Sequence, residues 1–370
     1  MKILFTNFHN TNGGGHVTYI LDLARELSGQ HDVSLAVSPT SRLYRYAREL
    51  ADVRVIEQRY SSRLLRMIPE VRQLRRLLRA NRYDVVHVNG SADHRHVMLA
   101  CQGLSHRPKV VWTKHNDHSI TSFGNVLRAR LATDHVISVS SFVKSMVDNS
   151  PYAALPQTVI RHGIDTRRFS PADATDRNAQ RRALFGDEHD DLIVFGSTGG
   201  TDYDKGWLDL FAAVSRLPAE QRGRVRVLVA GAPLSPEKQR RVDDLGVAGL
   251  AVFPGLVDDV RPLLAACDVG FVLSYREALS YACREAMAMG LPALVSSAGG
   301  LPENVSHGHD GWIVPPKAPE AILPVLATIM QRPQVLAEMG RAARQKSEAE
   351  FAMAPFVAQT FAVYQAVTRS

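Results

Sequence analysis

With 370 residues, the chain is longer than one typical hydrophobic core, so we expect two domains. Hydrophobic residues make up 45% of it and charged residues 22%, which is the composition of a globular protein and excludes a disordered or fibrous chain. The net charge of +7 lies in the first half: 22 Lys and Arg face 13 Asp and Glu through Asp165, against 22 and 24 in the remainder. No apolar run reaches eighteen residues, and Met1-Lys2 leads directly into a strand-like stretch. We therefore expect neither a transmembrane helix nor a signal peptide.

The first predicted strand, Lys2 to Phe8, runs into the glycine-rich loop Asn10 to Gly15 and a helix from about His16 to Ser28. Glycines allow a backbone to approach a ligand closely at such a strand end. The dinucleotide fingerprint is absent because Thr18 stands where it needs glycine, and no lysine follows to make a P-loop. By itself, this loop is equally consistent with a plain turn.

Strand-like and helix-like stretches then alternate. Strands such as V-V-H-V and H-V-I-S-V are nearly continuous apolar runs, which are typical of buried parallel strands and predict a doubly wound α/β sheet. The expected strands are 33–37, 53–57, 84–88, 109–114 and 135–139, and the helices between them are 41–51, 63–82, 95–103 and 122–132.

One of these helices is strongly basic. The stretch Ser61 to Arg82 holds seven arginines and one glutamate, and an apolar stripe recurs at helical spacing: Leu64, Ile68, Val71, Leu74 and Leu78. It is either a packed surface helix or a segment that docks on an anionic membrane surface.

Histidines gather in the first half of the chain. His115 ends a strand in W-T-K-H-N-D, at the sheet edge where open α/β sheets bind ligands. His87 lies inside a strand and is expected to be a satisfied core residue. Asp93, His94 and His96 suggest a metal, but two histidines one residue apart near a helix start point in different directions, so we expect no metal there.

The three cysteines are separated widely and have no metal-ligand spacing, as fits a reducing cytoplasm. Cys283 has no candidate base nearby, so we expect a packing role. All three are Cys101, Cys267 and Cys283.

A polar, proline-containing stretch, Ser170 to Arg181, predicts a hinge between two domains. The second domain opens with a strand at Asp191 to Phe195 and the loop G-S-T-G-G-T-D-Y-D-K-G. Lys205 then stands at the start of a helix, which is the unfavourable end of the helix dipole for a cation. A bound diphosphate would explain that position.

The most informative stretch is Ser274 to Glu303, whose pattern predicts a loop at a strand end, a helix, a second strand and a turn. Glu277 lies in the loop, and Glu285 follows eight residues later on the helix. An ionised carboxylate only accepts hydrogen bonds, so carboxylates beside a helix N-terminus suit the hydroxyls of a sugar next to a phosphate. The tail from Pro319 to Ser370 predicts three helices.

These two glutamates, with the following G-L-P-A-L-V-S-S-A-G-G-L-P-E, resemble the E-x7-E signature of the retaining family 4 glycosyltransferases, including those of bacterial lipopolysaccharide and polysaccharide synthesis. The resemblance implies the GT-B fold, two Rossmann-like domains facing a cleft. It also implies an acceptor-binding domain at 1–170, a nucleotide-sugar domain at 171–350 and a last helix, 351–370, that packs back on the first domain. The sequence departs from the family in having Ala278, Leu279 and Ser280 where G-F-G is common, and Ser197 where an arginine is usual.

The resemblance also implies roles for individual residues. Glu277, His115 and Lys205 would be catalytic, with Glu277 and His115 near the transferred sugar and Lys205 on the diphosphate. Glu285 would bind the ribose. The remaining donor-binding residues would be Gly14, Gly15, Ser197, Ala278, Leu279 and Ser280, together with Lys205 itself.

The expected activity is transfer of a sugar, with retention of configuration, from a nucleotide diphosphate sugar, a UDP-sugar being favoured, to a glycan or glycolipid of the bacterial envelope. No metal or other cofactor is expected, because no D-x-D motif ends a strand. The protein should be cytoplasmic and, through its basic helix, peripheral on the inner membrane. Two alternatives stay open: a nucleotide-sugar 2-epimerase of the same fold, and a non-catalytic nucleotide-sugar or nucleic-acid binding protein. Nucleic acid is not an expected partner, since the basic helix lacks interleaved aromatic residues.

Overall fold

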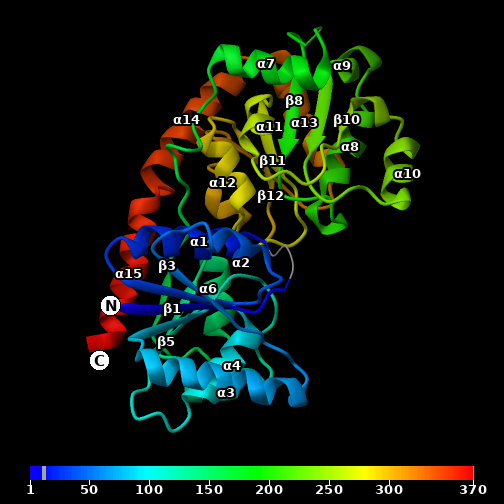
Figure 1. Ribbon diagram of the computed structural model, residues 1–370. Helices are drawn as coiled ribbons and strands as arrows, with labels where there is room; N and C mark the ends of the chain where they lie inside the picture. Colours follow the sequence, from blue (N-terminus) through cyan, green and yellow to red (C-terminus); the bar gives the residue numbers. More distant parts are fainter. Residues whose placement is uncertain (11–13, 188, 370) are drawn as a thin grey trace. The chain divides into compact units, whose positions relative to one another are not determined.

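A computed structural model describes residues 1–10, 14–187 and 189–369 (Figure 1). The predicted loop Asn10 to Gly15 therefore lies partly outside the described residues, at positions 11–13. The chain forms two compact units, which we describe separately: Met1–His162 together with the segment from Ala354 onward, and Gly163–Met353. Each is built on a parallel sheet covered by helices, so the predicted α/β class is confirmed.

The first unit has a sheet in the order β3-β2-β1-β4-β5-β6-β7, with every pair parallel. All the strands predicted for this region are present, and the short edge strand β7 is an addition that its polar sequence does not signal. The elements are β1 (Lys2–Asn7), α1 (Gly15–Ser28), β2 (Asp32–Val37), α2 (Arg42–Ala47), β3 (Val53–Glu57), α3 (Leu64–Asn81), β4 (Val85–Val88), α4 (Ser91–Cys101), β5 (Lys109–Lys114), α5 (Phe123–Ala132), β6 (His135–Ser138), α6 (Ser141–Asp148), β7 (Gln157–Val159) and α15 (Met353–Arg369).

The central strand β4 explains why these apolar runs form a two-sided sheet. All four of its residues have no exposed surface, so each face of the strand lies under a layer of helices. His87 is one of them, and both its ring nitrogens are hydrogen-bonded, Nδ1 to the Tyr364 hydroxyl at 2.5 Å and Nε2 to Thr113 Oγ1 at 2.6 Å. The prediction of a satisfied core histidine is confirmed.

The last helix, α15, belongs to this first unit. It reaches the sheet through Tyr364, the partner of His87, and its Phe361 ring stacks on His31 with ring centroids 4.4 Å apart. In Figure 1 the helix, coloured red, runs beside the first strand and the N-terminus.

The second unit has a sheet in the order β10-β9-β8-β11-β12-β13, again with parallel pairs. Its elements are α7 (Ala174–Phe185), β8 (Ile193–Ser197), η1 (Tyr203–Lys205), α8 (Trp207–Ser215), α9 (Ala219–Gly223), β9 (Val225–Val229), α10 (Pro236–Asp244), η2 (Ala248–Leu250), β10 (Ala251–Val252), α11 (Arg261–Ala265), β11 (Val269–Val272), α12 (Tyr281–Ala288), β12 (Ala293–Ser296), η3 (Leu301–Asn304), β13 (Gly311–Val314), α13 (Pro319–Gln331) and α14 (Val335–Glu350).

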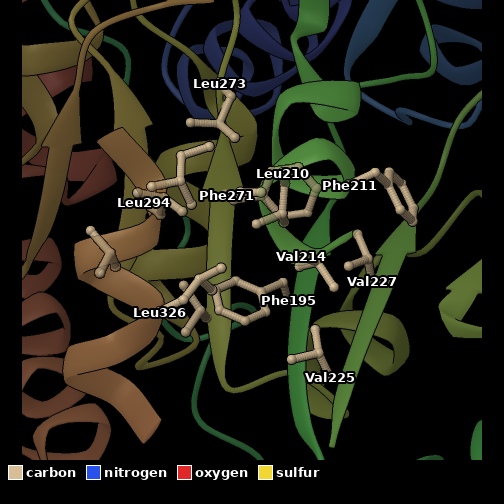
Figure 2. Packing of buried hydrophobic residues seen from close by; sticks show 14 of the residues in the cluster. Phe195, Leu210, Phe211, Val214, Val225, Val227, Phe271, Leu273, Leu294 and Leu326 are labelled. Carbon is tan, nitrogen blue, oxygen red and sulfur yellow. The ribbon is translucent and has the colours of Figure 1, made fainter. Parts of the chain in front are cut away.

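One hydrophobic cluster of this unit lies between the sheet and helices α8 and α13 (Figure 2), and two further clusters involve α12 and its neighbours. Phe195 from β8 and Phe271 from β11 pack with Leu210 and Phe211 of α8 and Leu326 of α13, and all five side chains are almost completely buried. Burying one such side chain contributes about 1.5–3 kcal/mol. The sheet and α8 are thereby fixed to each other, and so are the loops at the strand ends.

The stretch for which we expect a hinge, Ser170 to Arg181, is instead largely helix α7. Its polar face is occupied: Arg177 and Arg181 form ion pairs with Asp268 at 2.5 and 3.1 Å, just before β11. A helix held by arginine ion pairs has the same polar composition as a linker, and composition cannot tell the two apart.

The apolar stripe of α3 also differs from a simple packed face. Leu74 and Leu78 are buried, but Leu64, Leu65 and Ile68 in the first turns are 64%, 87% and 42% exposed. No helix in the described ranges is long and apolar enough to cross a membrane. The three cysteines are all unpaired and buried, as predicted, and burial raises the pKa of the Cys283 thiol to about 12.

Candidate functional site

At the carboxyl edge of the second sheet, the chain leaves β8 at Ser197 and reaches α8 through a glycine-rich loop that ends in η1. Gly206 follows η1 with φ +66°, and a Cβ there would lie 1.9 Å from the carbonyl oxygen of Leu273. Only glycine fits so close an approach. The contact brings Lys205, one residue earlier, to the end of β11.

There Lys205 meets Glu277. Its Nζ lies 3.1 Å from Glu277 Oε2, and both side chains are about three quarters buried. Burial alone would lower the pKa of Lys205, but Glu277 and the nearby Asp204 and Asp202 outweigh it and raise that pKa. The lysine is therefore fully charged at neutral pH and is neutralised by Glu277.

The loop that carries Glu277 is held by backbone and amide contacts. The Glu277 carbonyl accepts from Gly300 N–H at 3.0 Å, and the Leu279 carbonyl accepts from Asn304 Nδ2 at 2.7 Å. Asn304 is fully buried, and Arg284 Nε donates to its Oδ1 at 2.8 Å. Residues of η3 and α12 thus hold the loop in place through these hydrogen bonds.

Helix α12 begins directly after this loop. Ser280 is its N-cap, with φ +95° and a hydroxyl that accepts from Cys283 N–H at 3.3 Å. The side chains of Ala278 and Leu279 are buried, so these two residues can offer a ligand their backbone only. The first amides of a helix lack intrahelical acceptors and attract anions. Glu285 is half-buried on the same helix.

Ser197, which stands where the family usually has a cation, is the last residue of β8 and is 6% exposed. Its hydroxyl accepts weakly from Gly199 N–H at 3.4 Å. The preceding Gly196 is required by packing, since a Cβ there would lie 2.3 Å from the Cys267 sulfur. Ser197 thus supplies a hydroxyl, and no charge, at this strand end.

At the carboxyl edge of the first sheet, Gly14 and Gly15 open helix α1 and are exposed. His16 follows in the first turn. Its ring stacks on His9 with centroids 4.0 Å apart and lies 6.0 Å from the ring of His115, which follows β5. The glycine pair and His115 are therefore neighbours at one sheet edge.

The imidazoles of this edge are neutral. Burial, reinforced by His16 and His87, lowers the pKa of His115 well below 6.5. Burial together with His9 lowers the pKa of His16 to about 3. His115 Nε2 lies 2.9 Å from Asn89 Oδ1, and its ring meets Tyr19 edge-on with centroids 4.6 Å apart. The rings of His16 and His115 therefore carry no charge at neutral pH.

The predicted site residues thus fall into two groups, one in each unit. The structure brings Lys205 to Glu277, and it brings Gly14 and Gly15 near His115. Sequence reasoning missed three supporting residues, Asn89, Gly206 and Asn304. Gly206 could have been noticed beside Lys205, and Asn304 directly follows the conspicuous Glu303, whereas nothing in the sequence marks Asn89.

The histidines near the start of α4, where we expect no metal, bond to other groups. His94 Nε2 lies 3.0 Å from the Ala132 carbonyl oxygen, and His96 Nε2 lies 3.1 Å from Glu70. The two rings point to different partners, as predicted. Over the described ranges no group of three or more His, Cys, Asp or Glu side chains is placed to hold a metal ion.

Two known protein families match most of the chain. Residues 13–168 match the family described as Glycosyltransferase Family 4, and residues 190–332 match the family described as Glycosyl transferases group 1. The chain belongs to the family 4 glycosyltransferases. The first match takes in Gly14, Gly15 and His115, and the second takes in Lys205 and both glutamates, so this family 4 glycosyltransferase carries its predicted site residues inside the matched regions.

Two curated relatives illustrate the range of the family. The chain is 25% identical to N-acetyl-alpha-D-glucosaminyl L-malate synthase of Bacillus anthracis, over 77% of this chain and 75% of the relative. It is 31% identical to alpha-maltose-1-phosphate synthase of Mycolicibacterium smegmatis, over 64% of each chain. The chain spans about half to three quarters of the length of such relatives.

Among solved structures, the fold matches Anabaena Alr3699/HepE in complex with UDP with a TM-score of 0.84 at 20% identity, over 99% of this chain and 100% of that one. At this identity the likeness concerns the fold. It is the GT-B fold, two Rossmann-like domains, as predicted for this family 4 glycosyltransferase.

Proposed function

We propose that the protein transfers a sugar, with retention of anomeric configuration, from a nucleotide diphosphate sugar to a hydroxyl of an envelope glycan or glycolipid, lipopolysaccharide included. The Lys205–Glu277 pair at the carboxyl edge of the second sheet carries this proposal. It joins one cation for a diphosphate to one carboxylate for sugar hydroxyls, next to the N-terminus of α12. A UDP-sugar is the favoured donor, and the UDP complex of the Anabaena protein supports that choice.

In this mechanism the departing diphosphate gains negative charge, which preorganised donors must stabilise. Lys205 turns from Glu277 to the phosphates, and the backbone at Ala278, Leu279 and Ser280 supplies further donors. Glu277, released from its ion pair, accepts hydrogen bonds from the sugar. The leaving phosphate takes the acceptor proton on the same face, so neither a protein base nor a metal ion is required.

Three further roles complete the proposal. Glu285 accepts the ribose hydroxyls, and the Ser197 hydroxyl replaces the usual second cation. Gly14, Gly15 and His115, in the unit assigned to the acceptor, take the roles in transfer that the family resemblance implies. The donor then belongs to the Gly163–Met353 unit, and the reaction takes place in the cytoplasm.

A binding screen tests the donor site. Thermal unfolding is followed with UDP, GDP, ADP, CMP and their common sugar conjugates, for the wild type and for Glu285→Ala and Lys205→Ala. We expect stabilisation by one nucleoside diphosphate series that both variants lose. The screen is followed by a transfer assay with glycolipid acceptors, and with L-malate as a small acceptor suggested by the Bacillus relative. No shift with any nucleotide and no transfer would refute the proposal.

Two finer points need separate measurements. The anomeric configuration of the product, read from proton couplings in the NMR spectrum, should equal that of the donor. Activity should be unchanged after treatment with EDTA. Inversion would exclude the retaining mechanism, and a loss restored by a divalent cation would exclude metal independence.

We also propose that the start of α3 docks on an anionic membrane surface. Leu64, Leu65 and Ile68 expose apolar area there, and exposed arginines lie beside it and further along the same helix: Arg63, Arg66, Arg72, Arg76 and Arg79. Apolar side chains that enter the interface beside basic ones give attraction to acidic lipid of about 1 kcal/mol per charge. This would place the protein on the cytoplasmic face of the inner membrane.

Liposome sedimentation tests this surface. Binding to vesicles with acidic lipid should exceed binding to neutral vesicles, and Leu65→Glu should abolish it. Leu256→Glu is the matched control, because Leu256 is 65% exposed in the other unit. Equal, negligible binding to both kinds of vesicle would end the idea.

A further inference from the structure

Asn89 follows β4 at the carboxyl edge of the first sheet and is 5% exposed. Its Nδ2 donates to the carbonyl oxygens of Thr6 and His87, each at 3.2 Å. Carbonyl oxygens only accept hydrogen bonds. If the amide nitrogen and oxygen of Asn89 were exchanged, Oδ1 would face these two carbonyl oxygens with no proton between them. The amide therefore has one orientation, with its nitrogen toward the strands and its oxygen away from them.

That oxygen lies 2.9 Å from Nε2 of His115. An amide oxygen has no proton to give, so the proton of this hydrogen bond must lie on the imidazole. In a neutral imidazole with Nε2 protonated, Nδ1 carries a lone pair and can only accept. His115 is neutral at physiological pH because burial, His16 and His87 lower its pKa.

We propose that Asn89 is a positioning residue that fixes His115 in the Nε2–H tautomer, so that Nδ1 accepts a hydrogen bond from a substrate hydroxyl. This deepens the proposed function and rests on it for the identity of the substrate. A sugar or polyol hydroxyl supplies the proton that Nδ1 lacks. A phosphate or carboxylate oxygen would place its lone pairs against that of Nδ1, and the neutral ring offers no charge to compensate.

The backbone of Asn89 is itself held in place by the side chain of Asp93. Its N–H donates to Asp93 Oδ2 at 2.9 Å, and the same oxygen accepts from Gly90 N–H at 3.2 Å and from Thr6 Oγ1 at 2.8 Å. Asp93 is fully buried in α4. A side chain at Gly90 would collide with the Phe8 ring, since its Cβ would lie 2.3 Å from it. Backbone and amide are both fixed, so the tautomer is set before any ligand arrives.

The tautomer can be measured without a substrate. Protein labelled with ¹⁵N in its histidine rings is studied by long-range ¹H–¹⁵N NMR at pH 7, and His115→Gln identifies the signals. We expect wild-type His115 as the neutral Nε2–H form and a mixture of both tautomers in Asn89→Ala. Asn125→Ala is the matched control, because Asn125 is also 5% exposed in this unit and bonds to Ser122 and Arg128 instead. An Nδ1–H or imidazolium form in the wild type would overturn the proposal.

The kinetic test is a double-mutant cycle in the transfer assay. Asn89→Ala should lower kcat/KM about tenfold in the wild-type background and cause no further loss beside His115→Ala. Equal losses in both backgrounds would mean that Asn89 acts only on the structure, and would refute the positioning role. The NMR result separates the two proposals: the expected tautomer in a protein without transferase activity would refute the proposed function and leave the tautomer assignment standing.

Discussion

At the carboxyl edge of the sheet in Gly163–Met353, Lys205 and Glu277 form a charged pair 3.1 Å apart, whereas the corresponding edge in Met1–His162 carries imidazoles that burial keeps neutral. Both edges end parallel strands, and both lead through glycines into a helix. The topology brings loops together at an edge, and the residues that follow each strand decide its charge. The Lys205–Glu277 pair suits a diphosphate, and the neutral imidazoles suit hydroxyls. The edge with the imidazoles also holds one cation, Lys114, whose Nζ donates to the carbonyl oxygens of Asn116 and His118.

The Lys205–Glu277 pair depends on the close approach of Gly206 to the backbone of Leu273, and the substitution Gly206→Ala would prevent that approach. The new Cβ would lie 1.9 Å from the Leu273 carbonyl oxygen and would require φ +66° of a non-glycine residue. We expect a loss of about 3 kcal/mol in the free energy of unfolding and weaker nucleotide binding. Thermal unfolding measures this, with Gly223→Ala as the control, since Gly223 has no atom within 4 Å of its Cβ position. An unchanged melting temperature for Gly206→Ala would contradict the conclusion that only glycine fits at this turn.

Removing the cation tests the charged edge more directly. Lys205→Ala should lower the transfer rate by about ten- to a hundredfold, because a charge-assisted contact contributes about 1.5–3 kcal/mol. Lys238→Ala, which removes a lysine paired with Asp202 at 3.7 Å, should leave the rate nearly unchanged. Full activity in Lys205→Ala would mean that the diphosphate binds elsewhere.

Acid should destabilise the unit that holds the buried neutral imidazoles. Burial lowers the pKa of both His87 and His94 to about 3, so in the folded state they stay neutral while the unfolded chain takes up protons near pH 6.5. The contribution of these two neutral histidines to the free energy of unfolding is therefore fully present above about pH 6.5 and is lost as the pH falls below it. Asp93 acts in the opposite direction, because burial raises its pKa to about 7 and its folded form binds a proton as the pH falls.

Between pH 7 and pH 5, His87 and His94 should each cost about 2 kcal/mol and Asp93 should return about 2, for a net loss of about 2 kcal/mol from these three groups. The lowered pKa values of His16 and His115 add to this loss. Hydrogen exchange at the amides of β4, corrected for the intrinsic exchange rate, measures the stability of this unit separately from that of the other unit. His87→Gln should reduce the loss. Equal protection at both pH values would show that these rings titrate in the folded state.

The smallest expected effect concerns the other half of the charged pair. In the absence of a ligand Glu277 neutralises Lys205, so a diphosphate must displace it. Glu277→Gln should therefore bind a nucleoside diphosphate a few-fold more tightly, equivalent to about 1 kcal/mol, while transfer falls. Calorimetric titration measures the affinity. Weaker binding of the nucleotide would mean that Glu277 supports the phosphate site and does not compete for it.

Local pattern was enough to predict the fold class. Apolar runs such as Val85–Val88 are long enough for strands and have no polar face, so they require helices on both sides of a parallel sheet. The spacing of Glu277 and Glu285 and the position of Lys205 at a helix start identified the family, because each is written in consecutive residues. The roles of Glu277, Glu285 and His115 in transfer stay predictions.

The tertiary structure decided what depends on residues far apart in the chain. It revealed that Arg177 and Arg181 pair with Asp268 and make a helix of a stretch that looks like a linker. It also brought the Leu273 carbonyl against Gly206, and Asn89 against His115. Sequence patterns report a residue's neighbours along the chain, whereas a hydrogen bond or a close contact depends on neighbours in space. The tautomer of His115 is therefore set by a residue that nothing in the sequence marks.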